Sequence, residues 1–360
     1  MLFLLLLPLP QRLGPKLPLL LLLPVFFSGM DYLGIVLATG DMPMFPLRLE
    51  WWVPFSYSSF TGQLYWAPNH ALALWLATVL FYRHWGHPSL PALLLILVPL
   101  LVIWTPFAVA GLMPFVGLAV FRKVAFRQPA GGLGLTWLQG ITALYMLWIT
   151  IRLMTLGVAS IQGAPTAAYH PAEHDLGLKY ALFCLMEFAI LALLLARNIR
   201  HSHGLFWLAT AILFLLPLYQ FGPSNDAMLR LSTPCLLVIM LQCMEQLQSC
   251  WRQSWQTLRH TTFPALAIVL LIGAQTPFNE IWRALNFRKI PPNYGMTLID
   301  TQHGSEPAHY VGRLDRADVV AFLRSPGLVP ECTDRLLGGL AVEVPCGRIP
   351  SGKNPPLPAR

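Results

Sequence analysis

Long apolar runs set the strongest limit on what this chain can fold into. A membrane-spanning helix needs about 20 predominantly apolar residues, within a range of about 17 to 25. The chain holds about nine such runs, at residues 17–37, 69–85, 89–105, 107–122, 134–157, 180–197, 204–221, 227–247 and 262–279. Of its 360 residues, 56% are hydrophobic and 11% are charged, whereas about a quarter of the residues in soluble domains are charged. We therefore predict an all-α integral membrane protein with about nine transmembrane helices.

The placement of arginine and lysine predicts the orientation, because cytoplasmic loops carry an excess of both. With a cytoplasmic start, the loop cations on the cytoplasmic side are Arg12, Lys16, Arg83, Arg122, Lys123, Arg127, Arg197, Arg200, Arg252 and Arg259. Arg48 and Lys179 fall on the outer side. The pattern requires residues 89–122 to form two spans that are broken at Thr105–Pro106. It explains the net charge of +8 without a nucleic-acid partner, and it predicts a multi-pass protein of the bacterial cytoplasmic (inner) membrane.

Two domains are expected on this topology. Residues 1–279 form the polytopic transmembrane domain, with an outer loop at 31–68, and residues 280–360 form a small α+β extracytoplasmic tail. In an oxidising compartment Cys332 and Cys346 could pair, which would contribute roughly 3 kcal/mol. The other four cysteines have no ligand spacing and are interpreted as packing residues; they are Cys184, Cys235, Cys243 and Cys250. The apolar start at Met1, without a basic region before it, suggests a chain that begins late in a longer reading frame.

The outer loop holds the first candidates for chemistry. Asp31 ends an apolar run where no local structure requires a carboxylate, and Glu50 stands directly before Trp51 and Trp52. An acidic group beside two tryptophans fits a carbohydrate site, although an interfacial aromatic belt explains the tryptophans equally well. At the start of the second run, two side chains could bond a substrate or cap the helix, namely Asn69 and His70.

Ionisable residues at membrane depth form the second group of candidates, since their burial is costly. Glu187 lies near the middle of its span, and Arg152 and Arg230 lie near the outer ends of theirs. Glu187 could pair with one of these arginines, either to fasten helices or as a coupling pair. In the turn FGPSND, Asn225 can cap the next helix and Asp226 lies in its first turn. Arg230, one turn further on, either pairs with Asp226 or binds a phosphate.

Four sequence segments carry a resemblance to a known family: FFSGMDYLG, LEWW, YSSFTGQLYWAPNHALALWL and GPSNDAMLRLSTP. They resemble a family of polytopic bacterial membrane proteins with the architecture of GT-C glycosyltransferases. That resemblance implies transfer of a sugar from a polyprenyl-phosphate carrier outside the cytoplasm. It also implies that an acidic residue of the first outer loop, here Asp31 or Glu50, acts as the base. Members of the family begin with further spans and an earlier acidic outer loop, which this chain lacks.

The leading hypothesis is therefore a GT-C-like glycosyltransferase whose carrier phosphate is held by Arg230, with Arg152 as a second candidate. The expected partners are membrane lipid, a polyprenyl-phosphate-linked sugar and other proteins of envelope polysaccharide biosynthesis. The alternatives are a transporter of a lipid-linked saccharide or small solute, and a non-catalytic subunit of an envelope machine. Motifs for nucleotide, dinucleotide, zinc and haem binding are missing from the sequence, so no cofactor and no metal are predicted.

Overall fold

The computed structural model describes residues 17–43, 49–50, 55–125, 137–158, 176–199, 202–219, 226–250, 253–258 and 261–286. The chain divides into two compact units, one of residues 1–151 and 165–291 and the other of residues 152–164 and 292–360. All the helices considered below belong to the first unit, apart from the last residues of α8. The predicted α+β tail beyond residue 286, with Cys332 and Cys346, lies outside the described residues.

The described residues are helical, with no sheet among them. In chain order the elements are α2 (Leu17–Phe26), α3 (Asp31–Thr39), α4 (Phe60–Trp66), α5 (Pro68–Arg83), α6 (Leu90–Trp104), α7 (Pro106–Ala125), α8 (Trp137–Val158), α9 (Leu176–Cys184), the π-helical segment η3 (Leu185–Ala189), α10 (Ile190–Ala196), α11 (His203–Leu215), the 3₁₀ segment η4 (Leu216–Leu218), α12 (Asp226–Leu231), α13 (Thr233–Cys250), α14 (Trp255–Leu258), α15 (Phe263–Gly273) and α16 (Gln275–Asn286).

Each of the nine predicted runs coincides with a helix or with a helix that is interrupted once. Four of these are long and apolar enough to cross a membrane, which indicates a multi-pass membrane protein; they are Leu22–Thr39, Leu176–Ala196, Met228–Cys250 and Phe263–Asn286. The nine-span topology stays a prediction. The predicted break at Thr105–Pro106 is confirmed, because α6 ends at Trp104 and α7 begins at Pro106, and the two helices pack against each other.

Helix α13 is the central element of the first unit. Its span is 78% buried, against 33% for both Leu22–Thr39 and Phe263–Asn286, and it packs against α5 and α11. Cys235, Cys243 and Cys250 are buried in it, as is Cys184 in α9. Cys184, Cys235 and Cys243 belong to the hydrophobic core, in agreement with their interpretation as packing residues.

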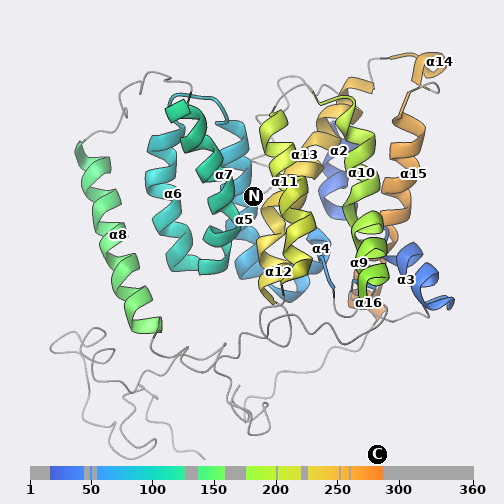
Figure 1. Ribbon diagram of the computed structural model, residues 1–360, viewed down its shortest axis with the longest axis horizontal. Coiled ribbons are helices and arrows are strands. Elements are labelled where there is room, and N and C mark those ends of the chain that lie inside the picture. The colour runs from blue at the N-terminus through green and yellow to red at the C-terminus, as the bar shows by residue number, and fades with distance from the viewer. Residues whose placement is uncertain are drawn as a thin grey trace, which may run out of the picture. The chain divides into compact units, whose positions relative to one another are not determined.

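All four long spans are interrupted. Residues 27–30 separate α2 from α3, η3 separates α9 from α10, Ser232 separates α12 from α13, and Ala274 separates α15 from α16. Three of the interrupted spans contact one another, because α3 packs against η3, α15 and α16. Figure 1 shows α3, α4 and α16 at one end of the bundle and α14 at the other. Irregular backbone at membrane depth is tolerated only where it is buried in protein or lines a polar cavity, so the interruptions mark a specialised region.

Candidate functional site

Four buried carboxyl groups gather where these interruptions meet. Residues Asp31, Glu50, Glu187 and Glu280 are between 0% and 4% exposed, and we call them the acidic cluster. Glu50 interacts electrostatically with Asp31 and Glu280, and Glu187 interacts with Asp31 and Glu50. Buried carboxylates are normally paired with cations or protonated, so a cluster of four requires a reason.

Glu50 is held by the segment that leads into α4. One carboxylate oxygen, Oε2, accepts a hydrogen bond from the Ser58 hydroxyl at 2.7 Å. The other, Oε1, accepts from the Ser59 backbone N–H at 3.0 Å and from the Ser59 hydroxyl. Ser59 is also the N-cap of α4, since its side chain accepts from the Gly62 N–H at 3.0 Å. A side chain at position 62 would collide with Glu50, because a Cβ there would lie 2.1 Å from Oε1.

The pKa of Glu50 is raised from its usual 4.5 to about 7. Burial is the main cause, and the nearby charges of Asp31 and Glu280 act in the same direction, while the hydrogen bonds from Ser59 and Ser58 favour the charged form and limit the rise. A carboxyl group of this kind is half ionised near neutral pH, the range in which a general base is most effective.

Asp31 is the first residue of α3 and is 0% exposed. Its Oδ2 accepts hydrogen bonds from the Ser28 hydroxyl at 3.0 Å and from the Thr276 hydroxyl at 2.8 Å. The N-terminus of a helix favours a negative charge, so the break before α3 gives Asp31 a favourable position. No local sequence feature explains this carboxylate, and the tertiary structure supplies a reason for it.

Glu187 is the central residue of η3, and it shares a side-chain hydrogen bond with Asp31. The backbone beside this contact is also joined, since the Met30 N–H donates to the Met186 carbonyl at 3.0 Å. Gly29 permits the approach, because a Cβ there would lie 2.2 Å from Glu187 Oε2. We predicted that Glu187 pairs with an arginine. The charged groups that act on it most strongly are instead the carboxyl groups of Asp31 and Glu50. Single π-turns inside α-helices are frequent at functional sites.

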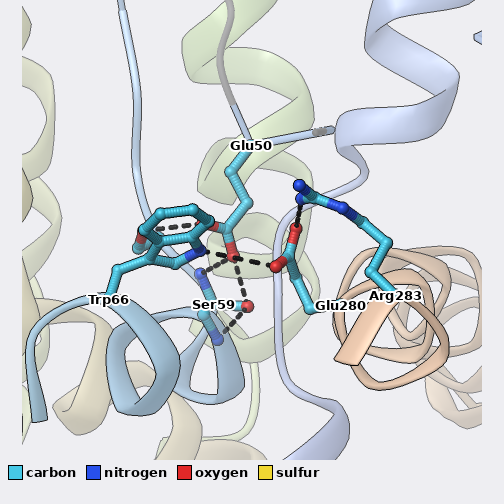
Figure 2. Close-up of polar contacts among 7 residues, drawn as sticks. Glu50, Ser59, Trp66, Glu280 and Arg283 are labelled. Atoms are coloured by element: carbon cyan, nitrogen blue, oxygen red, sulfur yellow. Dashed lines mark hydrogen bonds and ion pairs between the residues drawn. The ribbon is translucent and has the colours of Figure 1, made fainter. Parts of the chain in front are cut away.

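Helix α16 closes the cluster with its polar face. Glu280 Oε1 pairs with Arg283 Nη1 at 2.7 Å, and the Arg283 side chain is 22% exposed. Glu280 Oε2 accepts a long hydrogen bond of 3.4 Å from the Trp66 indole N–H. Figure 2 shows the carboxyl groups of Glu50 and Glu280 directed toward the same space, with Trp66 and Arg283 on its two sides. Trp66 is 54% exposed, so this side of the cluster reaches the surface.

Other predicted site residues lie apart from the cluster or outside the described residues. Arg230 lies in the last turn of α12, with its guanidinium 5.1 Å from the Phe107 ring centroid. Asp226 is the first residue of α12, as predicted. Arg152 is an exposed residue of α8 in the second unit. The remaining predicted residues Trp51, Trp52 and Asn225 lie outside the described residues.

The predicted pair at the start of α5 has a structural partner. His70 Nδ1 lies 2.6 Å from the Thr105 hydroxyl, and the Asn69 carbonyl accepts from the Trp104 indole N–H at 2.7 Å. These contacts join α5 to the break between α6 and α7. The Asn69 side chain is exposed, and neither residue caps α5, whose N-cap is Ala67.

Sequence reasoning missed the contribution of α16 and of the serines before α4. The four inward residues of α16 are Thr276, Asn279, Glu280 and Arg283, at intervals of three, one and three. This spacing places them on one helical face, while Phe278 and Leu285 are exposed on another. This spacing is visible in the sequence. It was missed because the predicted transmembrane domain ended at residue 279, in the middle of the pattern.

No protein-family model, curated protein or solved structure matches this chain. The relation to GT-C architecture therefore stays a prediction.

Proposed function

We propose that this chain is a GT-C-like membrane glycosyltransferase in which Glu50 is the general base. The proposal is carried by one observation: Asp31 and Glu50, from the two segments expected to supply the base, belong to the same buried cluster. On the predicted topology this cluster is extracytoplasmic. In the reaction, the bond between the anomeric carbon and the carrier phosphate breaks as the acceptor oxygen bonds that carbon. The acceptor proton passes to Glu50, and polyprenyl phosphate leaves as the anion.

Glu50 is preferred to Asp31 as the base for two reasons. The pKa of Glu50 lies at about 7, where a carboxylate is both available and basic. Asp31 shares a hydrogen bond with a second acid, Glu187, so its carboxyl group is engaged within the cluster. Glu50, by contrast, lies near Glu280 of α16, which contacts the partly exposed Arg283 and Trp66.

Arg283 is the proposed anchor for the carrier phosphate. Its guanidinium is partly exposed, its present partner is a carboxylate, and a phosphate would compete for the same donors. Exposed aromatic side chains lie on both elements of this side, Trp66 on α4 and Trp282 on α16. These two tryptophans could pack against the apolar chain of the carrier and stack on a sugar ring. Arg230 remains the predicted alternative, since it also lies at a helix end, beside Phe107.

Binding of a polyprenyl monophosphate to the full chain in lipid nanodiscs tests the anchor, with the matching polyprenol as the ligand without phosphate. Arg283→Gln should weaken binding of the phosphate about 10- to 100-fold, as expected for the loss of a charged hydrogen bond. Arg230→Gln tests the alternative in the same assay. The matched control is Arg83→Gln, because Arg83 is an exposed residue in the last turn of α5. Equal binding of phosphate and polyprenol would contradict the proposal.

Sugar transfer from mixed polyprenyl-phosphate sugars of a bacterial membrane extract tests the base. Glu50→Gln should lower the rate about 10²- to 10⁴-fold without weakening carrier binding to the same degree. Asp41→Asn is the control, since Asp41 is an exposed carboxylate just beyond α3. Retention of the wild-type rate in Glu50→Gln would remove Glu50 from this role.

A proton-coupled transporter of a lipid-linked saccharide is the second candidate. The interruption of three spans beside buried carboxyl groups favours it, because transporters form their substrate and ion sites at discontinuous helices. Flux of a lipid-linked saccharide across proteoliposomes, with and without a proton gradient, separates the two functions. A transferase does not respond to the gradient, and a proton-coupled transporter does.

A further inference from the structure

Asp31 and Glu187 form a distinct pair within the acidic cluster. Asp31 begins α3, Glu187 is central in η3, and the two carboxyl groups share a hydrogen bond. The contact is fixed by backbone on both sides. The Met30 N–H bonds the Met186 carbonyl at 3.0 Å, and the Glu187 Cα lies only 2.7 Å from the position of a Cβ at Gly29.

One carboxyl oxygen of Glu187 has an unmet hydrogen-bonding requirement, and this indicates a bound proton. Its Oε1 is buried and accepts no hydrogen bond from any donor in the described residues, and the residue is 4% exposed. A buried acceptor without a donor is costly. A proton on Glu187 turns this carboxyl group into a donor toward Asp31. Two carboxyl groups can form a hydrogen bond only when one of them is protonated.

We propose that Asp31 and Glu187 form a binding site for a single proton at the meeting point of three interrupted helices. When the proton leaves to water, two adjacent carboxylates remain in a buried site and repel each other. Proton binding therefore stabilises the packing of α3 on η3. The inference does not depend on the proposed transferase activity.

The surroundings of the pair are acidic or neutral where they are closest. The titratable groups that face it from the packed elements are Glu50 and Tyr57 from the segment before α4, Cys184 from α9, and Glu280 with its partner Arg283 from α16. Helices α10 and α15, which also pack nearby, contribute no titratable side chain within their helical bounds. Two cations of the described residues lie on packed elements: Arg283, which is engaged by Glu280 at 2.7 Å, and Lys179 of α9, the helix that packs against α3 and η3.

The interrupted backbone connects the site to the helices around it. Gly273, the last residue of α15, approaches the Ser28 carbonyl so closely that a Cβ would lie 2.4 Å from that oxygen. Thr276, in the first turn of α16, donates to Asp31. A change at the pair thus reaches α3, η3 and α16 through direct contacts, which is the arrangement required of a proton-dependent conformational element.

Infrared spectroscopy of the full chain in lipid nanodiscs tests the proposal through the C=O stretching band of a protonated carboxyl group. All measurements use the Glu50→Gln background, so that this carboxyl group contributes no band and no titration. At neutral pH we expect one protonated-carboxyl band from the pair, and Glu187→Gln should remove it, because the amide donates to Asp31 without a proton. Glu245→Gln, which alters a partly buried carboxyl group on α13, is the control and should keep the band.

Thermal unfolding over a pH series is the second measurement. The parent chain should lose stability as the pH rises and the pair ionises, and Glu187→Gln should lose less. If Glu187→Gln does not fold, Asp31→Asn replaces it, with Asp41→Asn as its control. A band of the same intensity in the parent and in the pair variant, together with parallel pH profiles, would overturn the proposal.

Discussion

Two clusters of polar residues, one buried and one partly buried, differ in a way that separates a structural role from a functional one. The acidic cluster lies before and around α4, where α5 begins. A second group, which we call the Tyr82 cluster, lies at the other end of α5 and consists of Tyr82, Ser202, Gln242 and Glu245. There the Tyr82 hydroxyl donates to Glu245 at 2.8 Å and accepts from Ser202 at 3.2 Å and from Gln242. Donor and acceptor positions of the hydroxyl are all used.

The Tyr82 cluster has one carboxyl group, uninterrupted helices on α5 and α13, and matched donors and acceptors. Such interhelical hydrogen bonds fasten helices in a membrane. The acidic cluster has four carboxyl groups, an oxygen without a donor, and helix interruptions at three of its elements. Its glycines allow approaches that any side chain would block. The comparison indicates that burial of polar groups alone does not define a site, and that an excess of like charge at irregular backbone does.

The largest expected effect is from closing the glycine contact of the acidic cluster. A Cβ at Gly29 would lie 2.2 Å from Glu187 Oε2 and 2.7 Å from its Cα. Overpacking typically costs about 1–3 kcal/mol of stability. Because the backbone must move here, Gly29→Ala should lower the free energy of unfolding by about 3 kcal/mol or more. Thermal unfolding in detergent measures this. Gly117→Ala, on α7 with no atom within 4 Å of its Cβ position, should be neutral or stabilise by up to about 1 kcal/mol. Equal melting temperatures for the two variants would contradict the packing.

The next effect is the pH dependence that Glu50 confers. Because the pKa of Glu50 is raised from 4.5 to about 7, the folded state binds this proton more tightly than the unfolded state. The resulting stability is fully present below pH 4.5 and is lost as the pH rises to about 7. Wild type should therefore lose up to about 3 kcal/mol relative to Glu50→Gln over that interval. Unfolding at a series of pH values checks this, and a constant difference between the two proteins would refute it.

Removing the central hydroxyl of the Tyr82 cluster should have an effect of intermediate size. Tyr82→Phe leaves Glu245, Ser202 and Gln242 without their common partner, at an expected cost of about 1–3 kcal/mol. Tyr145→Phe is the control, since that tyrosine is 57% exposed and keeps its stacking on Trp148. A loss in Tyr82→Phe no greater than in the control would mean that the cluster does not fasten the helices.

The smallest effect is expected at the surface side of the acidic cluster. Trp66→Phe keeps an aromatic ring and loses a long hydrogen bond of 3.4 Å to Glu280, so its stability should change by less than about 1 kcal/mol. Trp104→Phe loses a 2.7 Å bond to the Asn69 carbonyl and should lose more. If Trp66→Phe proves the more destabilising in thermal unfolding, Trp66 has a structural role that its exposure does not indicate.

Much of the helical framework was predictable, because apolar length and loop charge are local properties of the chain. The runs located the helices, and the loop charges required the break at Thr105–Pro106. The helix interruptions were harder to predict from the sequence. A break before Asp31 and a π-turn at Glu187 depend on contacts with other spans, such as the Met30 to Met186 hydrogen bond, and hydropathy averages over them.

Three of the four carboxyl groups of the candidate site were predictable from the sequence, but their pairings were not. Asp31, Glu50 and Glu187 stood out as carboxyl groups that local structure did not require. The expected partner of Glu187 was an arginine, since opposite charges usually compensate in membranes. The structure brings the carboxyl groups to one another instead, and the arginine it adds is Arg283, from a helix placed partly in the tail.

The sequence by itself determined that this protein is helical and suited to a membrane, because an apolar run of sufficient length has few other stable states in lipid or water. It also identified three of the four carboxyl groups of the acidic cluster, Asp31, Glu50 and Glu187. Only the tertiary structure decided that they share one region, because residues as distant in the chain as Asp31 and Thr276 meet through helix packing. The protonation of that region depends on the charges that packing brings together, and no local pattern contains them.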